Sequence, residues 1–181
     1  YSQPKLVLFT GVTSSACGTA QSAMGPFYCP NDQTVYLDMD FFRVMEQQLG
    51  SQGEFAKAYV IAHEVGHHVQ DEQGILQQTN ALRARASERQ SNEISVRVEL
   101  QADCYAGVWA HTVYEAGDLE EGDVEEAIGA SEAVGDDRLG VDSPESFTHG
   151  TSAQRVHWLQ TGYETGDVQS CDTFSLDESE L

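Results

Sequence analysis

Residues 63–67 read His-Glu-Val-Gly-His, which spaces two imidazoles four positions apart. On a helix such positions share a face one turn apart, so the rings of His63 and His67 can reach one metal ion at the zinc–nitrogen distance of about 2.0–2.1 Å. His68 points about 100° away from His67, so we expect a structural or supporting residue there and not a ligand of the same ion. A carboxylate beside a zinc-bearing pair can act as a base on water. The motif therefore indicates zinc-assisted hydrolysis, with His63 and His67 as ligands and Glu64 as the catalytic base.

A third ligand must come from elsewhere in the chain, because catalytic zinc usually keeps three protein ligands and one open position. Residues 99–103 read Glu-Leu-Gln-Ala-Asp within another helical pattern, which puts Glu99 and Asp103 on one face. We expect Glu99 to complete a His₂Glu site, and Asp103 to accept a hydrogen bond from a ligand histidine, His63 by preference. The alternative is an ordinary exposed Glu and a polar Asp, but the apolar setting of this helix argues against it.

Peptide hydrolysis also requires a donor that stabilises the oxyanion opposite the metal. We predict this catalytic role for His149, which lies in a loop before the last strong helical pattern. The alternative is a capping loop whose histidine packs on Trp158 or bonds to the backbone. Three tyrosines are rival donors that spacing does not rank: Tyr36, Tyr105 and Tyr163.

The elements that must position these residues are mostly helical. Short strands are predicted at 5–9 and 34–38. Apolar residues at spacings of three and four predict the helices, with glycines 50, 74 and 117 as candidate ends. The expected helices cover about 37–49, 54–70, a polar extension over 75–90, 92–116, one N-capped by Asp123, and one N-capped by Ser152 that runs to about Tyr163. We therefore expect an α+β fold with a small N-terminal sheet.

No linker or repeat divides the chain, so we expect one domain over residues 1–181, with its core at about 15–165. The tail, 166–181, should be peripheral, with the last ten or so residues frayed. The chain starts at Tyr1 and shows neither a signal-peptide pattern nor a run of 18 apolar residues. We expect a mature or trimmed product from which an upstream signal or membrane anchor has been removed.

Four cysteines allow two disulfides with three connectivities. Cys17 and Cys29 bracket a short segment and can close a loop, whereas Cys171 can attach the tail to Cys104. Four buried thiols are the alternative. Disulfides would place the protein outside the cytosol.

The charge balance is strongly acidic, with 30 Asp and Glu against 9 Lys and Arg. A nucleic-acid partner is excluded because phosphate binding requires a basic face. The excess acid can attract cationic peptides, favour solubility in high salt, or form an ordinary solvated surface. We favour the solvated surface, since the acids cluster at 118–137 in what we expect to be exposed helix and loop.

The longer strings around these motifs resemble the bacterial family of predicted neutral zinc metallopeptidases, the YpfJ-like proteins. The similarity runs over about residues 15–165. The spacing of the HExxH motif, Glu99 and Asp103 is also similar to the gluzincin pattern, H-E-x-x-H followed by E-x-x-x-D. The strings that carry the family resemblance are Ala62–Gln70, Glu99–Ala110, Gly25–Pro30 and His149–Arg155.

The resemblance implies a zincin-like fold, a Zn²⁺ cofactor, a peptide or protein substrate, and an exported or membrane-anchored protein. It also implies that strand 34–38 is an edge strand whose residues Val35–Asp38 pair with the substrate backbone. An interior strand is the alternative.

We therefore expect a zinc-dependent endopeptidase in which Glu64 takes a proton from the attacking water and delivers it to the leaving amine. The alternative is a non-catalytic zinc-binding module or assembly factor at the cell envelope, with a protein side chain closing the fourth coordination position. A base at Glu64 argues against that alternative.

Overall fold

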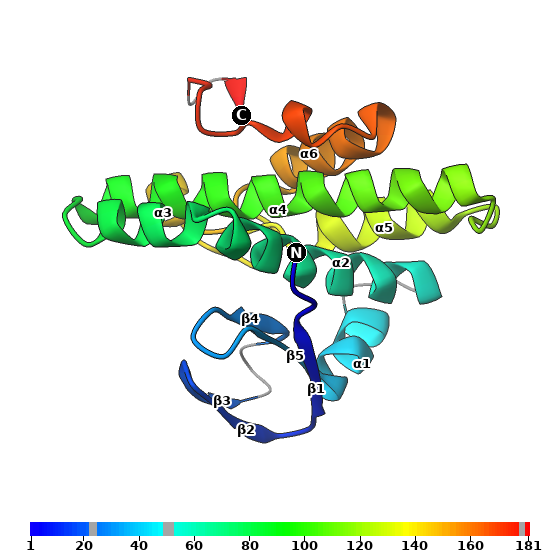
Figure 1. Cartoon of the computed structure of the whole chain (residues 1–181), viewed down its shortest axis with the longest axis horizontal. Coiled ribbons are helices and arrows are strands. Elements are labelled where there is room, and N and C mark those ends of the chain that lie inside the picture. The colour runs from blue at the N-terminus through cyan, green and yellow to red at the C-terminus, as the bar shows by residue number, and fades with distance from the viewer. Residues whose placement is uncertain (22–24, 49–52, 178–179) are drawn as a thin grey trace.

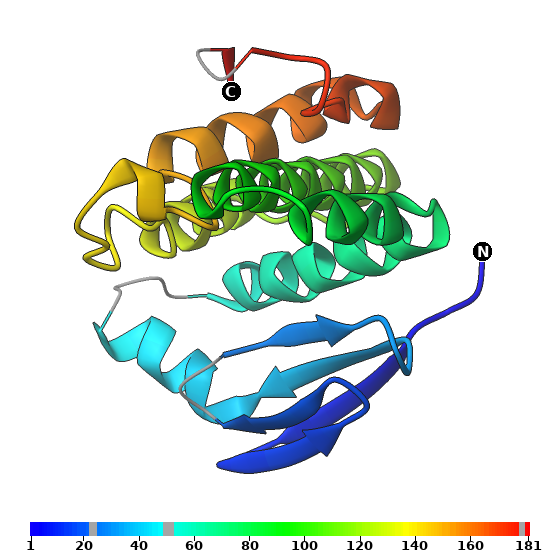
Figure 2. The same ribbon diagram turned by 90° about the vertical axis from the view of Figure 1, so that its left-hand side faces the viewer.

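Short strands open the chain and long helices follow, so the α+β prediction is confirmed. The computed structural model describes residues 1–21, 25–48, 53–177 and 180–181. The layers are stacked in order: the strands with α1, then α2, then α4 with α3 and α5, then α6 and the C-terminal segment (Figures 1 and 2). The helices are α1 Met39–Gln48, α2 Glu54–Glu72, α3 Ile75–Arg83, α4 Glu88–Ala116, α5 Asp123–Ala133 and α6 Ser152–Thr165, and the 3₁₀ turns are η2 Pro144–Ser146 and η3 Val168–Cys171.

Strand β5 is the centre of a three-stranded sheet and not its edge. It pairs in parallel with β1 and antiparallel with β4, in the order β1-β5-β4. All five residues of β5 are buried, as expected of a strand covered on both sides. The edge-strand prediction for Val35–Asp38 is therefore wrong, and β1 and β4 form the two edges. The strands are β1 Lys5–Phe9, β2 Val12–Ser15, β3 Gly18–Gln21, β4 Phe27–Cys29 and β5 Thr34–Asp38, with β2 and β3 forming a separate hairpin.

Helix α4 begins earlier than its apolar pattern indicates, because a capping box precedes it. The Ser87 side chain accepts from the Gln90 backbone N–H, and Gln90 reaches back to the Ser87 backbone N–H. The polar helix expected over 75–90 therefore ends at Arg83. Gly117 ends α4 in the left-handed region, with φ 79°, as predicted.

Two predicted N-caps lie one residue from the observed positions. Gly122, not Asp123, precedes α5, and Thr151, not Ser152, caps α6 through a second capping box with Gln154. Gly74, the expected end of α2, adopts the left-handed region just before α3. The predicted stop at Gly50 lies outside the described residues.

Two disulfides join Cys17 to Cys29 and Cys104 to Cys171, the pairs that the spacing suggested. The second disulfide holds the C-terminal segment against α4. The segment expected to be frayed is anchored as far as Thr173, which is buried and whose hydroxyl donates to the Arg97 carbonyl. No described helix is long and apolar enough to cross a membrane.

The site-bearing helices approach closely where glycines replace side chains. A Cβ at Gly66 of α2 would lie 3.0 Å from the Ala102 carbonyl oxygen of α4. Between α4 and α6 the fit is tighter: a Cβ at Gly107 would lie 2.1 Å from the Leu159 carbonyl oxygen, and one at Gly162 would lie 2.0 Å from the Cys104 carbonyl oxygen. These backbone contacts fix how far α4 stands from its neighbours on both sides.

Gly107→Ala should therefore destabilise the protein by about 3 kcal/mol or more, because the new methyl meets backbone and not a movable side chain. Gly129→Ala is the matched control. Gly129 is also helical, but a Cβ there would have no neighbour within 4 Å, so the substitution should raise stability by about 0.5–1 kcal/mol. Urea unfolding of both variants measures the difference. If both substitutions changed the free energy of unfolding equally, the close contact between α4 and α6 would not contribute to stability.

Candidate metal centre

His63, His67 and Glu99 meet between α2 and α4. The two histidines lie one turn apart on α2, and their ring centroids are 4.8 Å apart. His63 Nε2 lies 3.1 Å from Glu99 Oε2, and His67 Nε2 lies 3.4 Å from Glu99 Oε1. All three side chains are largely buried, with 9%, 13% and 18% of their surface exposed. The structure thus assembles two imidazoles and one carboxylate around a common point.

This donor set fits zinc. Ligands bound tetrahedrally at about 2.0–2.1 Å stand about 3.3 Å from one another, close to both nitrogen–oxygen distances here. The three ligand atoms all lie within 4.8 Å of one another, and among the described residues no fourth His, Cys, Asp or Glu joins the group. Zinc held by these residues would keep an open position facing solvent.

Asp103 holds the far side of the His63 ring. Its Oδ1 lies 2.8 Å from His63 Nδ1 and also accepts a hydrogen bond from the Tyr59 hydroxyl at 2.6 Å. Arg155 of α6 donates to both carboxylate oxygens, from Nε at 2.8 Å and from Nη2 at 3.1 Å. Because a carboxylate only accepts, His63 carries a proton on Nδ1, which leaves Nε2, on the Glu99 side of the ring, as the atom that can bind a metal ion.

His67 has a neutral partner instead. The side-chain oxygen of Gln70, one turn further along α2, lies 2.9 Å from His67 Nδ1. Gln70 is fully buried. Its amide nitrogen donates to the Val98 carbonyl and to Gln101. Both ligand histidines are thus fixed through Nδ1 and turn Nε2 toward Glu99.

Burial and neighbouring charges shift the pKa values of these groups in opposite directions. Burial opposes protonation of His63, but the Asp103 and Glu99 carboxylates together outweigh it and raise the pKa of His63 to about 10. Burial disfavours the Asp103 anion, yet Arg155 and His63 lower its pKa to about 2. Burial also raises the pKa of the Glu64 carboxyl, only partly offset by the two histidines. A carboxyl whose pKa moves toward neutrality is suited to exchange protons with water.

Glu64 lines a cleft of about 980 Å³ together with the three candidate ligands and His149. The cleft also reaches β4, the start of α1 and the side of α3. Glu64 is only 7% exposed, and its carboxylate forms no hydrogen bond or ion pair with another described residue. An acidic group in this position can meet a ligand in the cleft.

His149 is fixed by a buried acid that the sequence did not reveal. Asp136 Oδ1 lies 3.0 Å from His149 Nδ1, and Asp136 Oδ2 accepts from the backbone N–H groups of Thr148, His149 and Gly150. That hydrogen bond to the ring raises the pKa of His149, against a smaller effect of burial. The ring itself is about half exposed at the cleft wall. The loop is therefore organised around Asp136, and the alternative of packing on Trp158 is not seen.

His68, and the three tyrosines considered as alternative oxyanion donors, lie outside the cleft. His68 is fully buried and sits between the Ser2 carbonyl and the Tyr28 hydroxyl, which gives it a structural role. The three rival tyrosines do not line the cleft. The Tyr36 hydroxyl donates to Asp32, the Tyr105 hydroxyl donates to Gln73, and Tyr163 packs beside His111.

Several residues of the site were missed in the sequence. Arg155 appeared only within the family string, because a lone arginine on a helix usually reaches solvent. Tyr59 lies within the helix expected over 54–70, where its spacing alone gave no sign of a polar partner. Asp136 belongs to the acidic segment 118–137, which we expected to be exposed, but its side chain is only 2% exposed. Gln70 could have been predicted from the sequence, because it lies three residues after His67 on the same helix face. A histidine that binds a metal through one nitrogen requires a hydrogen-bond partner for the other.

Comparisons with known proteins agree with this geometry. Residues 1–174 match the model of a family described as “Putative neutral zinc metallopeptidase”. The chain is 53% identical over 179 residues to “Uncharacterized protein YpfJ” of Escherichia coli (strain K12), covering 96% of this chain and 62% of that protein. It is 47% identical over 191 residues to “Uncharacterized protein Rv2575” of Mycobacterium tuberculosis (strain ATCC 25618 / H37Rv), covering 97% of this chain and 64% of that protein. The chain thus spans less than two thirds of these relatives. No solved structure shows significant similarity to it.

Arg155→Met should lower the stability of the metal-free protein by about 3–5 kcal/mol, because it leaves the Asp103 charge buried without its cationic partner. Arg138→Met is the control. Arg138 is 61% exposed and pairs with Glu132 at the surface, so its loss should cost less than about 1 kcal/mol. Chemical unfolding after treatment with a chelator measures both. A small loss for Arg155→Met would mean that the ion pair does not hold the three helices together.

Proposed function

Because this chain belongs to the neutral zinc metallopeptidase family, we propose that it is a zinc-dependent endopeptidase acting through His63, His67, Glu99 and Glu64. One observation carries the proposal: three zinc-type ligands and an unengaged buried carboxylate share a single open cleft. The arrangement has the two carboxylate roles that metal-assisted hydrolysis requires, one as ligand and one as base.

In this proposal His63, His67 and Glu99 hold Zn²⁺, which when bound polarises a carbonyl and makes a nearby water more acidic. Glu64 follows a ligand in sequence and so lies beside the metal and not against it. Its carboxylate accepts the proton of the attacking water and passes that proton to the leaving amine. The burial that raises the pKa of Glu64 makes its carboxylate a stronger base and so favours uptake of the proton from water.

His149 is proposed to donate a hydrogen bond to the developing oxyanion. Its Nδ1 faces Asp136, so Nε2 is the atom left for a ligand in the cleft. With Nδ1 protonated and bound to Asp136, Nε2 donates only when the ring is a cation. Asp136 raises the pKa of His149 and therefore favours the donating form.

The substrate is proposed to be an extended peptide that lies along β4. This strand is one of the two edges of the sheet, and it borders the cleft through Phe27 and Tyr28. Edge strands bind peptides by main-chain pairing. The Tyr28 hydroxyl donates to Asp71 and meets His68, which ties the edge to α2 and hence to the metal ligands.

The rival function, a closed zinc-binding module, lacks support from the described residues. A structural site requires a fourth protein ligand, and no described His, Cys, Asp or Glu joins the group. The two disulfides favour an oxidising, extracytoplasmic location. We extend the proposal accordingly to a secreted, periplasmic or membrane-anchored protein with this domain outside the cytosol.

Glu64→Gln should keep one zinc per chain and lower peptide hydrolysis by about 10²–10⁴-fold, because an amide cannot take up the proton of the attacking water. Glu99→Ala should instead lose zinc, since it removes a ligand. Atomic absorption for metal content, and cleavage of a peptide library with and without a chelator, measure both properties. Cleavage by Glu64→Gln at the wild-type rate would exclude Glu64 as the base, and full zinc content in Glu99→Ala would exclude Glu99 as a ligand.

Asp136→Asn should shift the alkaline limb of kcat/KM to lower pH. The sign follows from the raised pKa of His149: without the Asp136 charge that pKa falls, so the donating cation is lost at a lower pH. Asp137→Asn is the control, because the Asp137 carboxylate binds the start of α6 through Ser152 and not His149. An unchanged pH profile in Asp136→Asn would remove His149 from the reaction.

A further inference from the structure

A chain of buried amides leads from His67 to the C-terminal segment. His67 Nδ1 lies 2.9 Å from the Gln70 side-chain oxygen. The Gln70 nitrogen donates to the Gln101 side-chain oxygen at 3.0 Å, and the Gln101 nitrogen donates to the Cys171 carbonyl at 2.9 Å. Gln70, Gln101 and Cys171 are 0%, 5% and 1% exposed. Every hydrogen bond from His67 to Cys171 is direct, and the three residues beyond His67 are shielded from bulk solvent.

Two backbone carbonyls, those of Val98 and Cys171, fix the direction of every hydrogen bond in this network. A backbone carbonyl only accepts, so Gln101 must turn its nitrogen to Cys171 and its oxygen to Gln70. Gln70 must then turn its nitrogen to Gln101, where it also reaches the Val98 carbonyl at 2.8 Å. Its oxygen is left for His67, which therefore carries its proton on Nδ1 and keeps Nε2 free for a metal.

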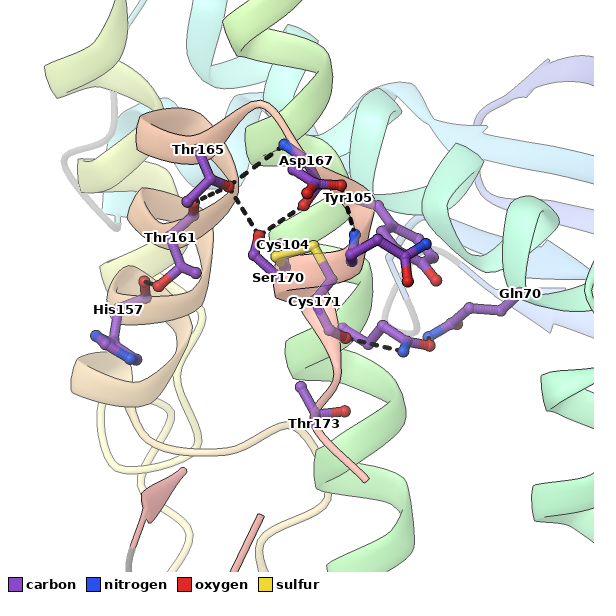
Figure 3. Close-up of a disulfide and its surroundings, with 12 residues drawn as sticks. Gln70, Cys104, Tyr105, His157, Thr161, Thr165, Asp167, Ser170, Cys171 and Thr173 are labelled. Atoms are coloured by element: carbon purple, nitrogen blue, oxygen red, sulfur yellow. Dashed lines mark hydrogen bonds between the residues drawn. A yellow bond between two sulfur atoms is a disulfide. The ribbon is translucent and has the colours of Figure 1, made fainter. Parts of the chain in front are cut away.

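The Cys171 carbonyl is itself held in place. The disulfide joins Cys171 to Cys104, one turn beyond Gln101 on the same helix, and Figure 3 shows Gln70 extending toward this segment from α2. Thr173, two residues on, donates to the Arg97 carbonyl at 2.7 Å and accepts from the Arg97 side chain. The tail is therefore clamped to α4 on either side of the carbonyl that ends the chain of amides.

We propose that Gln70 and Gln101 are positioning residues for His67, and that the disulfide-anchored segment 168–173 is part of the support of the metal centre. The two ligand histidines then have separate supports: Asp103 and Arg155 for His63, and the amides and the tail for His67. This proposal rests on the metal site of the proposed function, but it concerns metal affinity and ring protonation and not hydrolysis.

The experiment compares zinc affinity in Gln70→Met, Gln70→Glu, Gln101→Met and the control Gln160→Met, an exposed glutamine on α6. Competition with a chromophoric chelator gives the zinc dissociation constants. Gln70→Met removes the acceptor and should weaken zinc binding by about 10–100-fold. Gln101→Met leaves Gln70 held only by Val98 and should weaken it less, by about 3–10-fold. Gln70→Glu keeps an acceptor for His67 but loses the donor to Val98 and Gln101, so it should bind zinc more tightly than Gln70→Met does, and Gln160→Met should match wild type.

A second readout separates positioning from packing. In ¹⁵N NMR of the zinc-loaded protein, the His67 Nδ1 proton should be protected from exchange in wild type and Gln70→Glu, and exchange rapidly in Gln70→Met. Thermal unfolding of the metal-free variants shows whether each one folds. Wild-type affinity in Gln70→Met would overturn the proposal, as would a Gln70→Glu variant that folds but binds zinc as weakly as Gln70→Met. A wild-type protein that binds no zinc would instead overturn the proposed function.

Discussion

The buried carboxylate of Asp103 is the point on which the site depends. It lies on α4, accepts from Tyr59 and His63 of α2, and receives two hydrogen bonds from Arg155 of α6. One fully buried side chain thus connects three helices that lie in three successive layers. Removing such a charge from water is unfavourable unless every lone pair finds a donor, so each of the three helices must occupy its place before Asp103 is stable. The same requirement orients His63.

Close helix packing makes that convergence possible. Glycines at the α2–α4 and α4–α6 contacts let backbones approach where a methyl would not fit, and so bring short side chains such as Asp103 within reach of both neighbours. The sheet contributes differently. It lies against the opposite side of α2, and β4 is tied to that helix through Tyr28, which gives the cleft its second wall. The candidate metal site therefore lies where helix packing and the edge strand β4 meet.

Much of this could be predicted from the sequence, and the failures have a common cause. Helix periodicity placed His63 and His67 on one face, and apolar neighbours indicated that Glu99 and Asp103 lay in a buried helix. Strands 5–9 and 34–38 were located to the residue, but β4 was not, since it has three residues and no alternating pattern to reveal it. Partners distant in sequence were not predictable, because hydrogen bonding between Asp103 and Arg155 or between His149 and Asp136 leaves no periodic signal. Local spacing predicts which residues share a face, whereas tertiary contacts decide which faces meet.

Charge balance explains why the two ligand histidines have different supports. Glu64, Glu99 and Asp103 carry three negative charges in one buried region, and Arg155 supplies one positive charge. A divalent cation at the His63–His67–Glu99 group would bring the region to neutrality. A carboxylate behind His67 would leave an uncompensated charge there, and buried unpaired charge is costly. The neutral Gln70 supplies an acceptor without that charge, but an amide can face either way, so it requires a second contact to fix its direction. The Val98 carbonyl meets that requirement directly, and the Cys171 carbonyl adds to it through Gln101, which gives the C-terminal disulfide a place in the organisation of a site on the opposite side of α4.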